Sequence, residues 1–110
     1  MYYTYVLIST KDGKFYTGTT RNLKKRFEEH NKGIVHSTKH RKPFDLIYYE
    51  ACLCIEDAFR REKYLKSGKG KRYLRNRLKK SLETLHLCPA QFNVRGKLER
   101  HQCSKINIDT

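Results

Sequence analysis

Strand-forming residues occupy the N-terminal segment of the chain. Tyr2 to Ser9 is rich in Tyr, Thr, Val and Ile, which favours a β-strand. The triplet Lys11-Asp12-Gly13 follows, and an Asp-Gly pair supplies the positive φ that a hairpin turn needs. Lys14 to Gly18 then returns as a second strand, so the pattern predicts an antiparallel hairpin.

The apolar spacing becomes helical after the hairpin. Asn22 is expected to cap a helix in which Leu23 and Phe27, four residues apart, mark the side that faces the core. That helix is expected to run to about Asn31 and to stop at Gly33, since glycine commonly follows the last helical turn.

A further strand and two more helices are predicted downstream. The polar and basic residues 32–43 are expected to form a loop, and Phe44 to Ala51 has the apolar composition of a strand. Glu56 to Ser67 is predicted to be a helix that ends at Gly68, and Lys71 to Leu82 a third, basic helix.

These elements predict an α+β fold, with a small three-stranded antiparallel sheet flanked by about three helices. The three strands are expected to share one sheet, because a lone hairpin is only marginally stable. Residues 1–82 would form this domain. Residues 83–110 show no sustained period and are interrupted by Pro89 and Gly96. They are treated as a C-terminal extension, which could dock onto the domain or belong to a frayed tail.

The charge of the chain indicates a polyanionic partner. Its 110 residues contain 25 Lys and Arg against 11 Asp and Glu, a net charge of +14. Such self-repulsion opposes compaction, and nucleic acid or an anionic membrane surface would relieve it. No apolar run approaches the roughly 20 residues that span a bilayer, so a membrane partner is not expected. The N-terminus does not resemble a signal peptide, and the chain is expected to be cytoplasmic. Its oligomeric state is left open.

The four cysteines do not form a pattern typical of zinc sites. Cys52 and Cys54 make a C-x-C pair, but no second pair follows at finger-like spacing. A zinc site would need Cys88, Cys103 or a distant histidine such as His86. Ordinary thiols are therefore expected, and disulfides are not.

Glu62 is the most informative single residue. Ile55, Ala58, Phe59 and Leu65 fall on one stripe of the second predicted helix, and Glu62 projects into the middle of it. A carboxylate on an apolar stripe is costly unless it is paired or bound to a metal. Pairing with one of the many arginines and binding of a metal ion both remain open on this pattern.

Two more groups carry possible chemistry. Arg26 and His30 are four residues apart on the first helix, so their side chains share one face; an arginine there could hold a phosphate and a histidine could orient a water. A solvated arginine and a half-buried histidine are the alternative. Tyr3, Tyr5 and Tyr16 lie on the predicted hairpin together with Tyr2, where packing is the ordinary role of a tyrosine.

Several ordered segments together resemble a known family. They are Tyr5-Val6-Leu7, Phe15-Tyr16-Thr17-Gly18, Asn22 to Asn31, Ser37-Thr38-Lys39, Leu46 to Glu50 and Ala58 to Lys66. In this order and spacing they resemble the GIY-YIG nuclease domain, in particular its small stand-alone bacterial branch, over about Met1 to Leu82. The literal motifs differ: Tyr3-Thr4-Tyr5 replaces Gly-Ile-Tyr, and Tyr16-Thr17-Gly18 replaces Tyr-Ile-Gly. Both tyrosines and Gly18 are retained, with Gly18 expected to be structural.

The resemblance implies an activity and its residues. The implied activity is a metal-dependent endonuclease that hydrolyses phosphodiester bonds in nucleic acid, with DNA favoured over RNA. The implied site residues are Tyr5, Tyr16, Arg26, His30 and Glu62. Glu62 would bind one Mg²⁺ or Mn²⁺ ion, and Arg26 would stabilise the reacting phosphate. One of the tyrosines, with His30 nearby, would accept the proton of the attacking water. Which tyrosine does so is left open.

The alternative to an enzyme is a non-catalytic module that binds nucleic acid. Basic residues run from Arg60 to Lys80, and Tyr64 and Tyr73 interleave with them. Such a surface could hold phosphates and stack on unpaired bases without chemistry. A ribosome-associated basic protein is a further possibility. Glu62 separates these from an enzyme, because a pure binder gains nothing from a carboxylate within a basic face.

Overall fold

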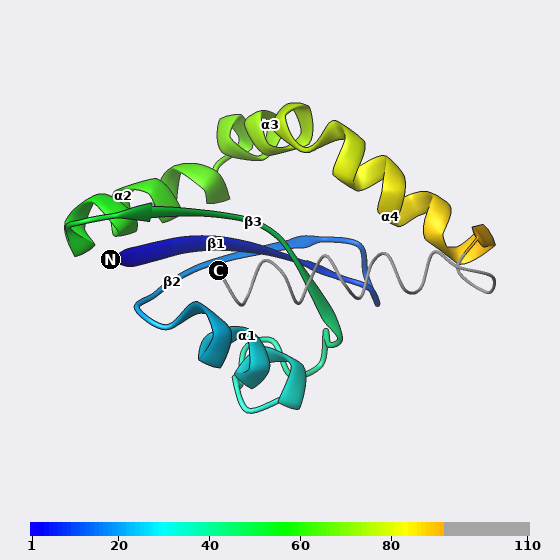
Figure 1. The fold of residues 1–110 in the computed structure, drawn as a ribbon, viewed down its shortest axis with the longest axis horizontal. Helices are drawn as coiled ribbons and strands as arrows, with labels where there is room; N and C mark the ends of the chain where they lie inside the picture. Colours follow the sequence, from blue (N-terminus) through cyan, green and yellow to red (C-terminus); the bar gives the residue numbers. More distant parts are fainter. Residues whose placement is uncertain (92–110) are drawn as a thin grey trace.

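A three-stranded antiparallel sheet lies between two helical layers (Figure 1). The structure is a computed structural model that describes residues 1–91. Its elements, in chain order, are β1 (Tyr2–Ser9), β2 (Phe15–Thr20), α1 (Leu23–Lys32), β3 (Phe44–Cys52), α2 (Ile55–Lys66), α3 (Gly68–Arg77) and α4 (Lys79–Gln91). The strand order is β2-β1-β3, so the N-terminal strand is central. The predicted α+β class and three-stranded antiparallel sheet are confirmed.

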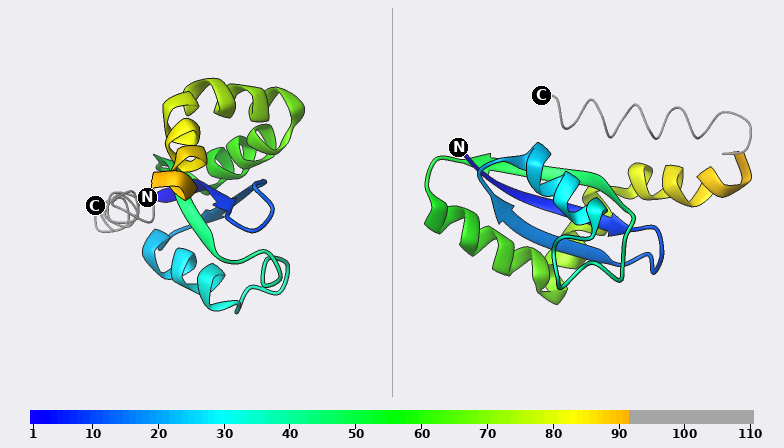
Figure 2. Two further views of the ribbon diagram at one scale, coloured as in Figure 1. Left: turned by 90° about the vertical axis from the view of Figure 1, so that its right-hand side faces the viewer. Right: turned by 90° about the horizontal axis from the view of Figure 1, so that it is seen from below.

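Alternation along β1 divides the interior into two cores. Tyr5 and Leu7 point toward α1 and pack with Leu23, Phe27, Phe44 and Leu46. Val6 points to the opposite face and packs with Leu65, Leu74 and Leu78 of the other layer. The views of Figure 2 show α1 on one face of the sheet and α2 with α3 on the other. Each core therefore depends on one side of a single strand.

The first helix begins and ends as its sequence predicts. The Asn22 side chain accepts a hydrogen bond from the backbone N–H of Lys25 at 3.1 Å. Gly33 follows the helix in the left-handed conformation, with φ of 79°, and its N–H bonds the carbonyls of Glu29 and His30. Both ends are encoded locally, because a side-chain cap and a glycine each act within one turn.

The junction between the second and third helices differs from the prediction. Gly68 was expected to end a helix, but it begins α3, three residues before the expected start at Lys71. Ser67 serves both helices: its N–H bonds the Tyr64 carbonyl, and its hydroxyl oxygen accepts from the N–H of Gly70. Because Ser67 caps the start of α3 directly after the end of α2, no linker residues are needed between the two helices.

The predicted third helix is in fact two helices. The expected span Lys71 to Leu82 is interrupted at Leu78, which ends α3 and turns its side chain into the core. A new helix, α4, then runs from Lys79 to Gln91, and beyond Leu82 it occupies a region in which no element was predicted. Leu82 of α4 packs against the same core, and this tertiary contact supports a helix whose own periodicity is weak. Residues 92–110 of the expected extension lie outside the described residues.

Within residues 1–91, every helix is too short or too polar to cross a membrane.

Of the two glycines of α3, Gly70 is the one expected not to tolerate a side chain. A Cβ at Gly70 would overlap the carbonyl oxygen of Tyr64 and the backbone of Leu65, where α3 crosses the end of α2. Gly70→Ala should therefore lower the free energy of unfolding by about 1–3 kcal/mol, as overpacking does. Urea denaturation measures the change.

Gly68→Ala is the matched control. No heavy atom of the described chain lies within 4 Å of a Cβ added at Gly68. Alanine there should be neutral or should stabilise the protein by up to about 1 kcal/mol, because it favours the helix over the unfolded chain. Equal losses in the two variants would show that the contact with Tyr64 is not what requires glycine.

Candidate active site

A chain of buried hydrogen bonds joins the central strand to the first helix. The Tyr5 hydroxyl lies 2.9 Å from Nε2 of His30. Nδ1 of the same ring lies 2.8 Å from the hydroxyl of Thr38, in the loop that precedes β3. His30 and Thr38 are fully buried, and Tyr5 is nearly so. Three segments far apart in sequence are thus held by one imidazole.

Burial keeps His30 neutral and Tyr5 protonated. Loss of solvent and the positive charge of Arg26 lower the pKa of His30 to about 4. Burial raises the pKa of Tyr5 to about 12, although the nearby Arg26 guanidinium acts in the opposite direction. A neutral imidazole has one donor and one acceptor nitrogen. The Thr38 hydroxyl also approaches the Val35 carbonyl, at 3.5 Å, which favours Nδ1–H as donor to Thr38 and the Tyr5 hydroxyl as donor to Nε2.

Gly18 makes room for the Tyr5 ring. It stands directly opposite Tyr5 in the β1–β2 pairing. A Cβ at Gly18 would collide with the hydroxyl end of that ring. The sequence predicts a structural role for Gly18 at a turn toward the helix. The structure gives a different reason, which is the close approach of an aromatic ring to the backbone.

Tyr16 and Arg26 border this buried chain on its solvent side. The rings of Tyr16 and His30 lie 4.9 Å apart between centroids, and those of Tyr16 and Tyr5 lie 6.4 Å apart. Tyr16 is only half-buried. The Arg26 side chain is 37% exposed and pairs with Glu29 at 3.2 Å. Its cation therefore remains accessible to an anion from solvent, with two phenols beside it.

Glu62 projects from α2 toward the edge strand. The hydroxyl of Thr19 in β2 donates to Oε1 of Glu62 at 2.5 Å, and Nζ of Lys66 lies 2.7 Å from Oε2. The Glu62 side chain is 21% exposed and that of Lys66 is 52% exposed. Pairing with an arginine was one sequence-based alternative; the ion pair observed here is with Lys66. An exposed i, i+4 pair of this kind contributes only about 0.3–0.5 kcal/mol.

Only part of the predicted apolar stripe on α2 is buried. Ala58 and Leu65 are fully buried, and Glu62 does lie between them. Phe59 was expected on this stripe but is 54% exposed. Its position is shifted one residue around the helix from Ala58, which moves its side chain off the contact with the sheet.

The structure brings four of the five predicted site residues together directly. Tyr5, Tyr16, Arg26 and His30 gather on the α1 side of the sheet, whereas Glu62 comes from the helix that covers the opposite side. Glu62 reaches β2, an edge strand, and its negative charge contributes to the raised pKa of Tyr5. The arrangement therefore spans the β2 edge, with cation and phenols on one side and a carboxylate on the other.

Three further residues complete this arrangement and were not predicted to contribute. They are Thr19, which bonds Glu62; Thr38, which bonds His30; and Glu29, which pairs with Arg26. Glu29 is three residues from Arg26, so its spacing could have identified it. Thr19 lies 43 positions from Glu62, and no local pattern links them.

The remaining hairpin tyrosines have packing roles. Tyr3 contacts Tyr49 edge to face, with ring centroids 5.9 Å apart. The Arg21 guanidinium lies over the ring of Tyr2, 5.3 Å from its centroid.

The structure contains no sign of a zinc site in its described part. Cys52 is half-buried, Cys54 is exposed, and both are free thiols. Across the described residues, no group of three or more His, Cys, Asp and Glu side chains could hold a metal ion. The side chains of His86 and Cys88, and the whole of Cys103, lie outside the described part.

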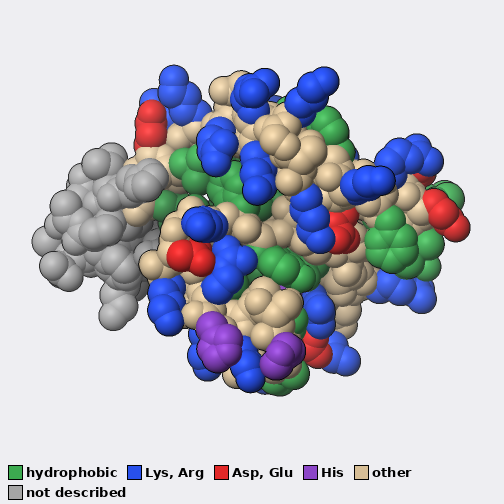
Figure 3. All heavy atoms as spheres, turned by 180° about the vertical axis from the view of Figure 1, so that it is seen from behind, with side chains coloured by type: hydrophobic (Ala, Val, Ile, Leu, Met, Phe, Trp, Pro, Cys, Tyr) green, Lys and Arg blue, Asp and Glu red, His purple; other side chains and the backbone are tan. Residues whose placement is uncertain are grey.

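Basic side chains spread over the surface, but not all are available to a ligand. Figure 3 shows Lys and Arg distributed across the visible face, with few acidic groups among them. Arg61 is one of the paired cations within the basic run: it pairs with Glu50 at 2.9 Å and lies 5.1 and 4.9 Å from the ring centroids of Tyr64 and Tyr73. These two tyrosines, expected as stacking platforms for bases, are partly occupied by this arginine.

Comparison with known proteins identifies the class of the domain. The GIY-YIG catalytic domain matches residues 1–79. The chain therefore belongs to the GIY-YIG catalytic domain family, a nuclease-type family, as its sequence motifs predict.

Its relatives are small bacterial UPF0213 proteins. One from Clostridium perfringens is 42% identical over 67 residues, covering 60% of this chain and 71% of the relative. One from Staphylococcus saprophyticus is 36% identical over 67 residues, covering 60% and 80%. One from Desulfotalea psychrophila is 36% identical over 62 residues, covering 54% and 56%. No solved structure matches the chain.

The buried His30 should make the fold sensitive to mild acid. Its pKa of about 4 lies below the ordinary 6.5, so the unfolded chain binds more protons between these values. The contribution of neutral His30 is therefore complete above pH 6.5 and is lost as the pH falls toward 4, by about 2–3 kcal/mol. Urea denaturation measures the free energy of unfolding of the wild type and of His30→Gln across this range. The difference between the two proteins should become smaller as the pH falls.

His36→Gln is the control, because the His36 side chain is exposed and His36 is not a member of the buried chain. It should leave the pH dependence of stability unchanged. A gap between wild type and His30→Gln that stays constant from pH 7.5 to 4.5 would contradict the assignment of a neutral, buried imidazole.

Proposed function

We propose that this protein is a metal-dependent endonuclease that hydrolyses phosphodiester bonds in nucleic acid, with DNA favoured over RNA. The observation that carries the proposal is the accessible Arg26 cation beside two phenols, across the edge strand from a half-buried carboxylate on α2. The catalytic chemistry is assigned to residues 1–82, with residues 83–110 as an extension.

Arg26 would bind the reacting phosphate. Its planar guanidinium can donate two parallel hydrogen bonds to phosphate oxygens. In the structure one donor is turned to Glu29, at 3.2 Å on a partly exposed pair, which an incoming phosphate can displace at little cost. Arg26 would then lie against the negative charge that develops at the phosphorus in the transition state.

The residues around Glu62 fit a single hard divalent ion. Mg²⁺ commonly binds through one or two carboxylates, with water and substrate phosphates as its other ligands. Glu62 offers one carboxylate, and the Thr19 hydroxyl, 2.5 Å away, fixes its orientation. Lys66 holds the second oxygen through an exposed contact that can open. Such an ion, Mg²⁺ or Mn²⁺, would supply Lewis-acid stabilisation of the phosphate and the leaving oxygen.

Tyr16 is the better placed of the two phenols to meet a water. Tyr5 is buried, its hydroxyl bonds His30, and burial raises its pKa, which makes its phenolate harder to form. Tyr16 is half-buried on the same face and packs against the same imidazole. We therefore assign acceptance of the proton from the attacking water to the phenolate oxygen of Tyr16, and treat Tyr5 and His30 as positioning residues that hold this ring and Arg26 in place.

The rival function, binding without catalysis, accounts for the charge but not for this carboxylate. A module that only holds phosphates is weakened by a negative charge near the bound backbone. The partial blocking of Tyr64 and Tyr73 by Arg61 also removes part of the stacking surface on which that rival relied.

Glu62→Gln is the sharpest test of the proposed metal site. The substitution keeps the size of the side chain and its hydrogen-bond capacity toward Thr19, but removes the charge that a hard cation requires. Nicking of plasmid DNA in Mg²⁺ or Mn²⁺ should be abolished, while binding to DNA persists or tightens. Stability should change by less than about 1 kcal/mol, since only an exposed pair with Lys66 is lost.

Glu56→Gln is its matched control, an exposed carboxylate on the same helix. Nicking should be unaffected by that change. Metal-stimulated nicking that survives Glu62→Gln would rule out Glu62 as the ligand.

Arg26→Ala should reduce turnover more than binding. Many other cations still hold the nucleic acid, whereas one donor at the transition state contributes about 10²–10³ in rate. Single-turnover cleavage and filter binding separate the two effects. Lys25→Ala, a neighbouring exposed cation, should lower both by the same small factor. If Arg26→Ala behaved like Lys25→Ala, Arg26 would be a general phosphate contact and not a catalytic residue.

A further inference from the structure

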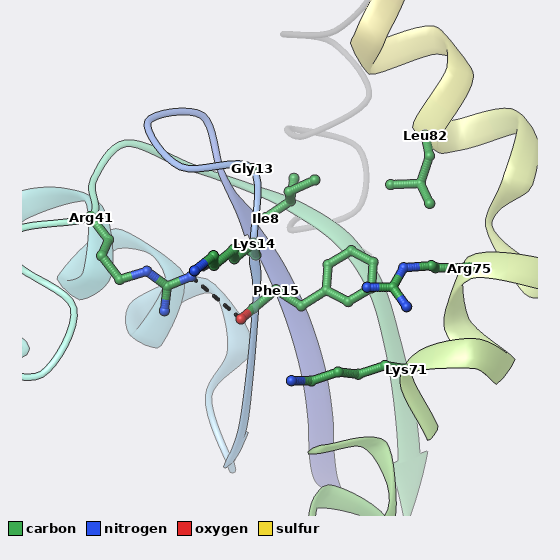
Figure 4. Close-up of a pocket in the computed structure, with 8 residues that line it drawn as sticks. All are labelled: Ile8, Gly13, Lys14, Phe15, Arg41, Lys71, Arg75 and Leu82. Atoms are coloured by element: carbon green, nitrogen blue, oxygen red, sulfur yellow. Dashed lines mark hydrogen bonds between the residues drawn. The ribbon is translucent and has the colours of Figure 1, made fainter. Parts of the chain in front are cut away.

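A basic cleft lies at the end of the sheet remote from Glu62. Its volume is about 550 Å³, and it opens between the β1–β2 hairpin and the helices α3 and α4 (Figure 4). The lining residues are Ile8, Gly13, Lys14, Phe15, Arg41, Lys71, Arg75 and Leu82. Half of these residues are cationic, and among all eight none is acidic.

The cleft combines an apolar floor with a cationic rim. Ile8, Phe15 and Leu82 provide the apolar surface, and Figure 4 shows Lys71 and Arg75 extending toward Phe15 from α3. The Arg75 guanidinium lies 6.0 Å from the centroid of the Phe15 ring. A sugar–phosphate chain matches this combination, since its sugars are weakly polar and its phosphates are anionic.

Arg41 has a structural role in the cleft. Its Nε donates to Asp12 at 2.7 Å, and its other donors reach the carbonyls of Lys14 and Phe15 at 3.2 and 3.4 Å. These contacts tie the hairpin to the loop that precedes β3 and fix the rim. Lys14, Lys71 and Arg75 are exposed and supply the rest of its positive charge.

The cleft and the proposed catalytic site lie along the same strand. Phe15 lines the cleft, and Thr19 bonds Glu62, so the two residues are four positions apart along β2. At about 3.4 Å per residue this is about 14 Å. A few consecutive nucleotides of one strand can span this separation, so the same backbone can reach both places.

We propose that this cleft binds the phosphodiester backbone of the nucleic-acid substrate, a few nucleotides from the phosphate that is cut. That the bound backbone belongs to a substrate rests on the proposed function. That the cleft binds a phosphodiester backbone rests on its own lining residues. The cleft holds the backbone through Lys14, Lys71 and Arg75, and thereby sets the direction in which the strand crosses the β2 edge. It is a positioning site, separate from Glu62 and Arg26.

The test is the salt dependence of binding to a fluorescein-labelled DNA duplex. Each phosphate contact contributes about 0.9 to the slope of log affinity against log salt concentration. Lys71→Gln/Arg75→Gln should lower that slope by about 1.8, and Lys14→Gln by about 0.9. The three residues are exposed, so the fold is retained, and thermal melting verifies this.

Lys69→Gln/Arg72→Gln is the matched control. It removes the same charge from exposed positions of the same helix that do not line the cleft. The slope should then stay close to that of the wild type. An equal fall in the two double variants would overturn the proposal, because the charge would act diffusely and not through the cleft.

Neutral methylphosphonate links, placed one at a time along the duplex, locate the contact. A link a few nucleotides from the cut should weaken binding by the wild type and leave binding by Lys71→Gln/Arg75→Gln unchanged. A site for small anions predicts a different result: inorganic phosphate, at matched ionic strength, would abolish the difference between the two proteins. That result would also overturn the proposal.

The outcomes separate this inference from the proposed function. The salt slopes need no cleavage, so they can support the cleft even if Glu62→Gln shows that the metal site is wrong. Conversely, loss of nicking in Glu62→Gln together with equal slopes in both double variants would support the proposed nuclease activity and overturn the proposal that the cleft binds the backbone.

Discussion

The hydrogen bond between Tyr5 and His30, 2.9 Å long and shielded from water, is the contact on which the α1 side of the molecule depends. It joins the middle strand to α1, the helix that follows the hairpin in the sequence. Because the imidazole also bonds Thr38, the loop before β3 is held by the same ring. Losing one partner would leave a buried polar atom unsatisfied, at a cost of about 1–3 kcal/mol.

This arrangement also explains why Tyr5 and Tyr16 differ although both lie on the hairpin. A phenol buried against a neutral imidazole gains rigidity and loses acidity, so Tyr5 supports the site. Tyr16, packed on the outer side of the same ring, keeps contact with solvent. The two tyrosines look equivalent in the sequence and are distinguished only by the strand register and by the position of α1.

The features that sequence could predict are those with local causes. The Asn22 cap, the Gly33 stop and the Asp-Gly turn each act within a few residues, and the strands followed from composition. The grouping of Tyr5, Tyr16, Arg26 and His30 came from resemblance to a family. The extent of α4 and the exposure of Phe59 were missed, because they depend on packing against distant segments. The Thr19 partner of Glu62 was missed for the same reason.

The central place of β1 has a consequence for the order in which this chain can assemble. Its hairpin partner β2 follows at once, but its other neighbour, β3, ends at Cys52. Until that residue has left the ribosome, one edge of an apolar strand has no partner. The core that α3 covers cannot be completed until Leu78 has also emerged. At about 5–20 residues per second, this interval lasts seconds. A nascent chain of this protein therefore carries an open strand edge, the kind of surface that chaperones shield, from the emergence of Ser9 until that of Cys52.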